Sequence, residues 1–73
     1  MKFHELGHRL RARRMALGID QRTLAEIAGV SVHAISNLEG GRGNPTVRVL
    51  DAVGIALGME LVWQVRAPNS EAP

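Results

Sequence analysis

The 73-residue sequence contains no cysteine or tyrosine and only one phenylalanine and one tryptophan. Without cysteine, disulfide bonds and thiolate zinc sites are excluded. With so few aromatic rings, binding of single-stranded nucleic acid by base stacking is disfavoured. No apolar run approaches the roughly 18 residues of a membrane span, and the N-terminus lacks the apolar stretch of a signal peptide. We therefore expect a cytoplasmic protein with no membrane partner.

The length of the chain allows one small domain, which we place at residues 1–66. Residues 67–73 contain two of the three prolines and are predicted to be a disordered tail. Apolar residues make up 45% of the chain and charged residues 22%, which is a globular composition. A chain this short buries only about 60% of the surface that it exposes when unfolded, so we expect it to oligomerise.

The charge is unevenly distributed along the chain. Residues 1–22 carry six cations and two anions, although the whole chain has a net charge of only +2. Eight of the nine cations are arginine, whose forked guanidinium group suits phosphate. A basic N-terminal region therefore indicates a polyanionic partner such as nucleic acid. The alternative is that these arginines only form an ordinary solvent-exposed face of a helix.

Apolar residues recur at helical spacing in four stretches of the sequence. In the first stretch, Leu6, Leu10 and Leu17 share one stripe that would face the core. Asp20 and Ser31 are suitable N-caps for the second and third helices. The pattern predicts an all-α fold with helices over residues 4–17, 21–28, 32–39 and 46–57.

The pattern changes to a period of two after the fourth predicted helix. One face of the segment 59–66 is apolar, and its residues are Met59, Leu61, Trp63 and Val65. This alternation is typical of a β-strand, but no other segment of the chain resembles one. Since a strand needs a partner for its backbone groups, we predict that two copies pair through residues 59–66 as a homodimer. The alternative is an extended arm that folds back onto its own helices.

The second and third predicted helices are separated by three residues that include Gly29, which is the spacing of a helix-turn-helix unit. Such a unit places its second helix, here 32–39, in the major groove of DNA. At 100° per residue, Ala34, Ile35 and Leu38 would face the core. The opposite face predicts a base-reading set consisting of Val32, His33, Ser36 and Asn37, whose side chains suit contacts with base edges. The alternative is an ordinary exposed polar face.

His4 and His8 lie four residues apart, a spacing that can chelate a metal ion on a helix. Only Glu5 or His33 is available as a further ligand, so we predict an exposed histidine pair and no metal or cofactor. The sequence contains no nucleophile–base pair. The glycines of residues 40–43 lack the lysine and the spacing of a nucleotide-binding loop. These features argue against an enzyme.

The helical region resembles the XRE/Cro-type helix-turn-helix family of bacterial and phage repressors. The resemblance covers residues 6–58 and is carried by Leu6-Gly7, Leu10-Arg11, Arg14, Leu17-Gly18, Gln21, Leu24-Ala25, Gly29-Val30-Ser31, Ile35-Ser36-Asn37-Leu38-Glu39, Gly41, Asn44-Pro45 and Ala56-Leu57-Gly58. It implies a four-helix, lambda-repressor-like domain that binds double-stranded DNA and represses transcription.

The resemblance also implies roles for individual residues. Arg14 and Glu39 match a structural ion pair inside the family's fold. Val32 stands where many members carry glutamine or arginine, which removes one polar base contact. The candidate contacts with the DNA backbone are Gln21, Arg22, Ser31, Arg42 and Asn44.

A four-helix domain followed by a hydrophobic strand, with the run Gly58-Met59-Glu60-Leu61 at the junction, resembles the HipB-like antitoxins. This resemblance implies a toxin–antitoxin operon, autorepression at a palindromic operator and binding of a HipA-like Ser/Thr kinase toxin. The alternative is a stand-alone dimeric regulator of the XRE family without a toxin partner.

Overall fold

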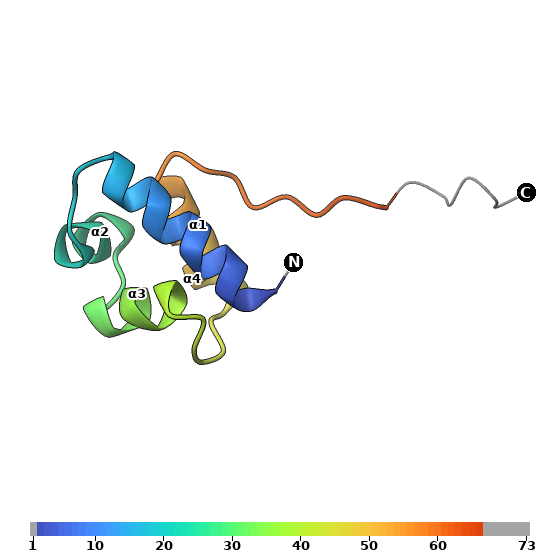
Figure 1. The fold of residues 1–73 in the computed structure, drawn as a ribbon, viewed down its shortest axis with the longest axis horizontal. Coiled ribbons are helices and arrows are strands. Elements are labelled where there is room, and N and C mark those ends of the chain that lie inside the picture. The colour runs from blue at the N-terminus through green and yellow to red at the C-terminus, as the bar shows by residue number, and fades with distance from the viewer. Residues whose placement is uncertain (1, 67–73) are drawn as a thin grey trace, which may run out of the picture.

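The computed structural model describes residues 2–66, and these residues form four helices and no strand (Figure 1). The helices are α1 (Phe3–Ala16), α2 (Gln21–Ala28), α3 (Val32–Glu39) and α4 (Val47–Ala56). This architecture confirms the predicted all-α, four-helix fold. The predicted bounds of the two central helices agree with the structure, and those of the outer two differ by one residue at each end. None of the described helices is long and apolar enough to cross a membrane.

Side-chain caps determine where three of the helices begin. Asp20, Ser31 and Thr46 each accept a hydrogen bond from the backbone N–H three residues later, at 2.8, 3.0 and 3.1 Å respectively. Each bond satisfies a donor that the first helical turn leaves without a partner. The helix α1 starts after Lys2 without such a cap. The starts of α2, α3 and α4 are therefore determined by residues that are close together in the sequence.

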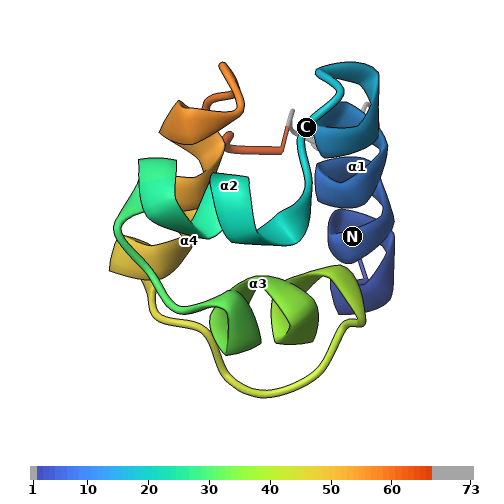
Figure 2. The ribbon, with the colours of Figure 1, turned by 90° about the vertical axis from the view of Figure 1, so that its left-hand side faces the viewer.

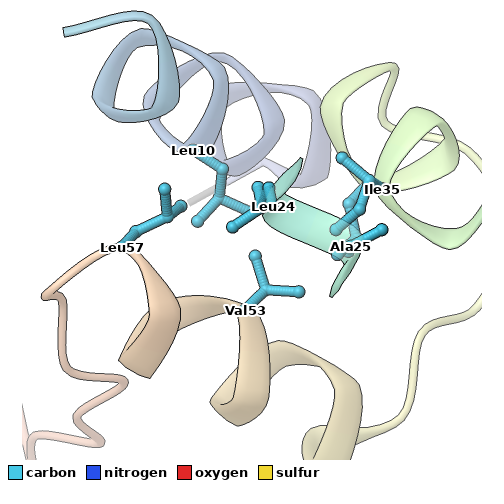
Figure 3. Close-up of a cluster of buried hydrophobic side chains, with 7 residues drawn as sticks. Leu10, Leu24, Ala25, Ile35, Val53 and Leu57 are labelled. Atoms are coloured by element: carbon cyan, nitrogen blue, oxygen red, sulfur yellow. The ribbon is translucent and has the colours of Figure 1, made fainter. Parts of the chain in front are cut away.

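The core is formed by apolar side chains from all four helices (Figure 3). Figure 2 shows α2 in the middle of the domain, with α1 and α4 on either side of it and α3 beside them. Leu24 of α2 is completely buried, which agrees with this central position. The buried apolar residues are Leu10, Leu24, Ala25, Ile35, Leu38, Val53 and Leu57. Removal of this surface from water is the main favourable contribution to folding.

Two predictions about inward-facing residues are wrong. Leu17 is 44% exposed and is not among the side chains that pack on the core, because it lies one residue beyond the end of α1. Ala34 is only half-buried, whereas Ile35 and Leu38 are buried as predicted. The buried stripe of α3 is thus narrower than the helical spacing suggested.

The chain leaves α4 through a tight turn and then becomes extended. Gly58 has a φ of 71°, the N–H of Met59 donates to the carbonyl of Gly54 at 2.7 Å, and Arg13 Nε donates to the carbonyl of Leu57 at 2.9 Å. Only the beginning of the segment packs on the domain, where Met59 contacts the core. The remainder projects outward (Figure 1).

The predicted strand is extended but is not a strand within this single chain. Trp63 and Val65 are 87% and 96% exposed, so the later part of the segment does not fold back onto its own helices as the alternative required, although Met59 does pack on the core. A strand forms only when another strand accepts and donates its backbone hydrogen bonds. Pairing across a homodimer therefore stays a prediction. The predicted tail, 67–73, lies outside the described residues.

The close crossing of α1 and α3 predicts a requirement for glycine at position 7. A Cβ atom there would overlap the carbonyl oxygen of Leu38 and lie 2.7 Å from that of Glu39. Because both are backbone atoms, Gly7→Ala is expected to lower the free energy of unfolding by about 1–3 kcal/mol. The loss should appear even though alanine is the better helix former by about 1 kcal/mol.

Gly54→Ala is the matched control for this prediction. Its Cβ would meet the carbonyl oxygen of Met59 at 3.4 Å, an ordinary contact, so this variant should be at least as stable as the wild type. Urea unfolding followed by circular dichroism measures both. Equal stability of Gly7→Ala and the wild type would contradict the close approach of the two helices.

Candidate DNA-binding surface

The helices α2 and α3 are joined by a three-residue turn, as in a helix-turn-helix unit. Gly29 ends α2 in the left-handed conformation with a φ of 71°, and the N–H of Val30 donates to the carbonyl of Ala25 at 3.0 Å. Ser31 then caps α3. In Figure 2, α3 lies along one edge of the domain, and the loop from α3 to α4 curves past the same edge.

The outward side of α3 carries the predicted base-reading residues. Val32 is 41% exposed, His33 is also exposed, and Ser36 and Asn37 are half-buried. The opposite side is anchored in the core by Ile35. The four side chains are accessible on one short helix, and their contact with bases stays a prediction.

The predicted backbone-contacting residues lie at three neighbouring places in the chain. Gln21 and Arg22 open α2, Ser31 precedes α3, and Arg42 and Asn44 lie in the loop after α3. Starts of helices carry free N–H groups and a partial positive charge, which suit phosphate. All except Gln21 are exposed.

Besides Ser31, which caps α3, two of these residues also bond to other protein groups. Gln21 Nε2 donates to Glu39 Oε1 at 3.2 Å. Arg42 Nη2 lies 3.3 Å from both the carbonyl oxygen and the hydroxyl of Ser36. Sequence reasoning missed both contacts, because they join residues whose distance in space is decided by the turn and the loop.

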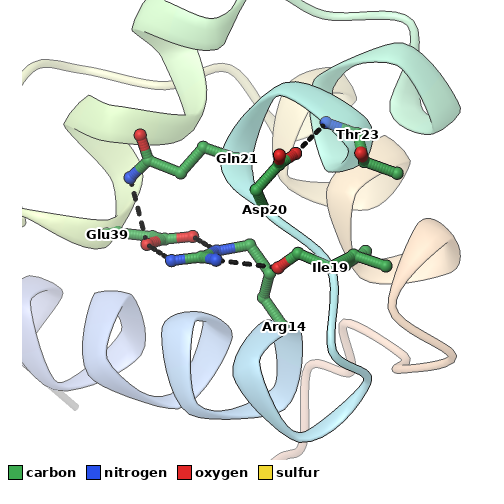
Figure 4. Close-up of polar contacts among 6 residues, drawn as sticks. All are labelled: Arg14, Ile19, Asp20, Gln21, Thr23 and Glu39. Carbon is green, nitrogen blue, oxygen red and sulfur yellow. Dashed lines mark hydrogen bonds and ion pairs between the residues drawn. The ribbon is translucent and has the colours of Figure 1, made fainter.

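A bidentate ion pair between Arg14 of α1 and Glu39 of α3 connects α1 to the helix-turn-helix unit (Figure 4). Arg14 Nε is 2.6 Å from Glu39 Oε2, and Arg14 Nη2 is 2.9 Å from Oε1. The two side chains are only 12% and 5% exposed. Arg14 Nη1 also donates to the carbonyl of Ile19 at 2.9 Å.

Hydrogen bonding to Glu39 raises the pKa of Arg14, while desolvation opposes the shift. Arg14 therefore remains cationic at physiological pH. Together with Gln21, the pair connects the end of α1, the turn before α2, the first residue of α2 and the last residue of α3. No buried side-chain nitrogen or oxygen among residues 2–66 lacks a partner, so the network is fully satisfied.

The cap of α2 carries a further electrostatic effect. Hydrogen bonds from the backbone and side chain of Thr23 lower the pKa of Asp20. The carboxylate is thus charged at neutral pH, and its negative charge interacts favourably with the positive, N-terminal end of the α2 dipole. Because Asp20 immediately precedes Gln21 and Arg22, it also places one negative charge beside the predicted phosphate contacts.

The predicted histidine pair is present on α1. The rings of His4 and His8 are 6.2 Å apart and meet edge to face. Within residues 2–66, no three His, Cys, Asp or Glu side chains are grouped so that they could hold a metal ion. Among the described residues, two imidazole rings are therefore close together here, but no third side chain completes a metal site.

A shallow polar hollow of about 270 Å³ lies beside α3. Arg11, Gln21, Ser36 and Arg42 contribute to its lining, and the Arg14–Glu39 pair forms another part. Arg11 belongs to the arginine-rich N-terminal region in which the sequence indicates a polyanionic partner. The hollow brings positive charge from α1 next to α3.

Comparisons with known proteins agree with this geometry. A family model described as a helix-turn-helix domain matches residues 5–62. A crystal structure of the clp gene regulator ClgR from Corynebacterium glutamicum is 36% identical, with a TM-score of 0.76, and the match covers 84% of this chain and 78% of that one. A second ClgR structure is 37% identical, with a TM-score of 0.74 and coverage of 82% and 64%. No curated protein gives a significant match.

The buried ion pair predicts a large effect when one partner is removed. Glu39→Ala would leave the Arg14 charge buried and unpaired, so the free energy of unfolding should fall by about 3–5 kcal/mol. Replacing both partners, with Arg14→Met and Glu39→Leu, should recover most of this loss, because apolar groups need no charged partner. Urea unfolding measures both variants. If the double variant were no more stable than Glu39→Ala, the loss could not be attributed to the stranded charge.

Proposed function

Because the chain belongs to the helix-turn-helix domain family of DNA-binding regulators, and not to a family of enzymes, we propose that it binds a palindromic operator as a homodimer and represses transcription there. The observation that carries the proposal is the accessible face of α3, which is backed by a buried core and preceded by the three-residue turn. Repression follows from occupation of the promoter by the bound dimer.

The outward side chains of α3 supply the sequence preference. Asn37 can donate to N7 and accept from N6 of adenine in two parallel hydrogen bonds. Ser36 can donate or accept at several bases, and the methyl groups of Val32 can contact the methyl group of thymine. His33, at the start of the helix, is exposed. This set has no acidic member, which suits a negatively charged partner.

Contacts with phosphates set the position of the domain on the duplex. Arg22 and Asn44 are exposed on either side of α3 in the chain, and the N-termini of α2 and α3 offer backbone N–H groups. Each phosphate neutralised by a cation releases counterions, so binding weakens as salt increases. These contacts provide affinity and register without base preference.

The segment 59–66 supplies the homodimer in this proposal. Leu61, Trp63 and Val65 of its apolar face are exposed in the single chain, and the segment forms no strand pairing there. If two such segments paired about a two-fold axis, each would bury the apolar face of the other and satisfy its backbone hydrogen bonds. Two recognition helices about 34–36 Å apart would then meet successive major grooves on one side of the DNA.

The similarity to ClgR, a clp gene regulator, favours a stand-alone regulator over an antitoxin. The HipB-like alternative, with a HipA-like kinase toxin as partner, has support only from the extended apolar segment after α4. The mass of the complex purified from the native cells separates these alternatives, because an antitoxin would carry a much larger protein in a fixed ratio.

The proposed role of Asn37 is tested with an operator selected from random duplexes by the wild-type protein. Asn37→Ala should weaken binding to this operator by about 1–3 kcal/mol, because a bidentate contact with one base is lost. Its unfolding midpoint should stay close to that of the wild type. Asn44→Ala serves as the control and should weaken binding to all duplexes equally. Wild-type affinity of Asn37→Ala would contradict the base contact proposed for Asn37.

The proposed dimer is tested by placing a charge on the apolar face of the segment 59–66. Trp63→Asp should convert the dimer into monomers, because a carboxylate cannot be buried there without a partner. Val62→Asp, on the opposite face, should remain dimeric. Sedimentation velocity measures both. Neither residue belongs to the core, so both variants should still fold. A Trp63→Asp variant that remains dimeric would rule out pairing through this face.

A further inference from the structure

The side chain of Arg42 turns back over the end of α3 instead of following the loop outward. The backbone N–H of Arg42 donates to the carbonyl of Asn37 at 2.8 Å, which closes the turn after the helix. The guanidinium then reaches Ser36, where Nη2 lies 3.3 Å from the hydroxyl and from the carbonyl oxygen. An arginine of the loop is therefore held next to a residue of the predicted base-reading set.

Gly40 leaves the space that this arrangement needs. Its φ of −86° and ψ of −2° are available to any residue, so the backbone does not require glycine there. A Cβ atom at Gly40 would overlap Arg42 Nη1 and lie 2.7 Å from Arg42 Cζ. The absence of a side chain at Gly40 therefore matters for Arg42, because the guanidinium occupies the volume that a Cβ atom would take.

The guanidinium keeps donors for a ligand. Its Nη2 is used on Ser36, whereas Nε and Nη1 form no hydrogen bond within residues 2–66. The nearest carboxylate in the sequence, Glu39, is already bound by Arg14 and Gln21. Arg42 is exposed, so its charge and part of its donor fork face outward from the same helix end as Ser36.

We propose that Arg42 is a specificity-determining residue that selects guanine at one base pair of the operator. In the major groove, guanine presents two acceptors, O6 and N7, which match a pair of N–H donors of arginine. Ser36 orients the guanidinium, and Gly40 admits it. This inference rests on the proposed function, since it requires α3 to lie in the major groove. A contact of Arg42 with phosphate alone is the competing outcome.

The test compares base preferences at every position of the selected operator. The wild type should prefer guanine at one position by roughly tenfold to a hundredfold. Arg42→Ala and Arg42→Lys should both lose most of this preference, because lysine keeps the charge but not the fork. Preferences at the other positions should persist. Arg48→Ala, which removes an exposed charge from α4, is the matched control and should retain all preferences.

Gly40→Ala tests the arrangement without removing the charge. The backbone accepts alanine, and only the flexible end of Arg42 has to move. The variant should fold normally and should lose the same guanine preference while its affinity for unrelated duplexes stays unchanged. A wild-type guanine preference in Gly40→Ala would overturn the role of the Ser36 contact.

A uniform loss of affinity in Arg42→Ala, with all base preferences retained and a salt slope smaller by about one, would identify a phosphate contact and overturn the proposal. Asn37→Ala distinguishes a failure of the role proposed for Arg42 from a failure of base recognition by α3. If it changes a base preference while Arg42→Ala does not, only the inference about Arg42 fails. If neither variant changes a preference, recognition by α3 itself fails.

Discussion

The bidentate pair between Arg14 and Glu39 is the interaction on which the rest of this structure depends. It joins α1 to the last residue of α3, and through Gln21 it also holds the first residue of α2. Because a buried charge is tolerated only when it is paired, the two helices of the helix-turn-helix unit have little freedom to separate. The relative position of the predicted phosphate contacts and the base-reading face follows from this pair.

Close backbone contact between α1 and the end of α3 supports the same arrangement, because Gly7 lies two turns before Arg14 on the same face of α1. Gly7 lets α1 approach the carbonyl groups at the end of α3, so the ion pair is formed between helices that already touch. The core side chains Leu24 and Ile35 then attach α2 and α3 to each other and to the rest of the domain. Rigid support of this kind keeps the short helix α3 in one orientation, which the proposed reading of bases would require.

The surface that the pair supports combines residues from a helix and from the loop after it. Ser36 belongs to α3, and Arg42 belongs to the loop, yet their polar atoms meet. Gly40 connects these two features because it omits the side chain that would separate them. Predicted base-reading side chains and positive charge are thus close together on α3, while the extended segment 59–66 leaves the domain elsewhere (Figure 1).

The sequence by itself determined the helices and the three-residue turn, because caps such as Asp20 and Ser31 and the apolar spacing act over only a few residues. Tertiary structure decided the exposure of Leu17, the attachment of Gln21 to Glu39 and the return of Arg42 onto Ser36. These depend on how far each helix extends past its neighbours and on where a loop directs a long side chain. Periodicity carries no information about either. The pairing of residues 59–66 depends on a second chain. The sequence pattern indicates that a partner strand is needed, but it does not determine where the backbone groups of that partner lie.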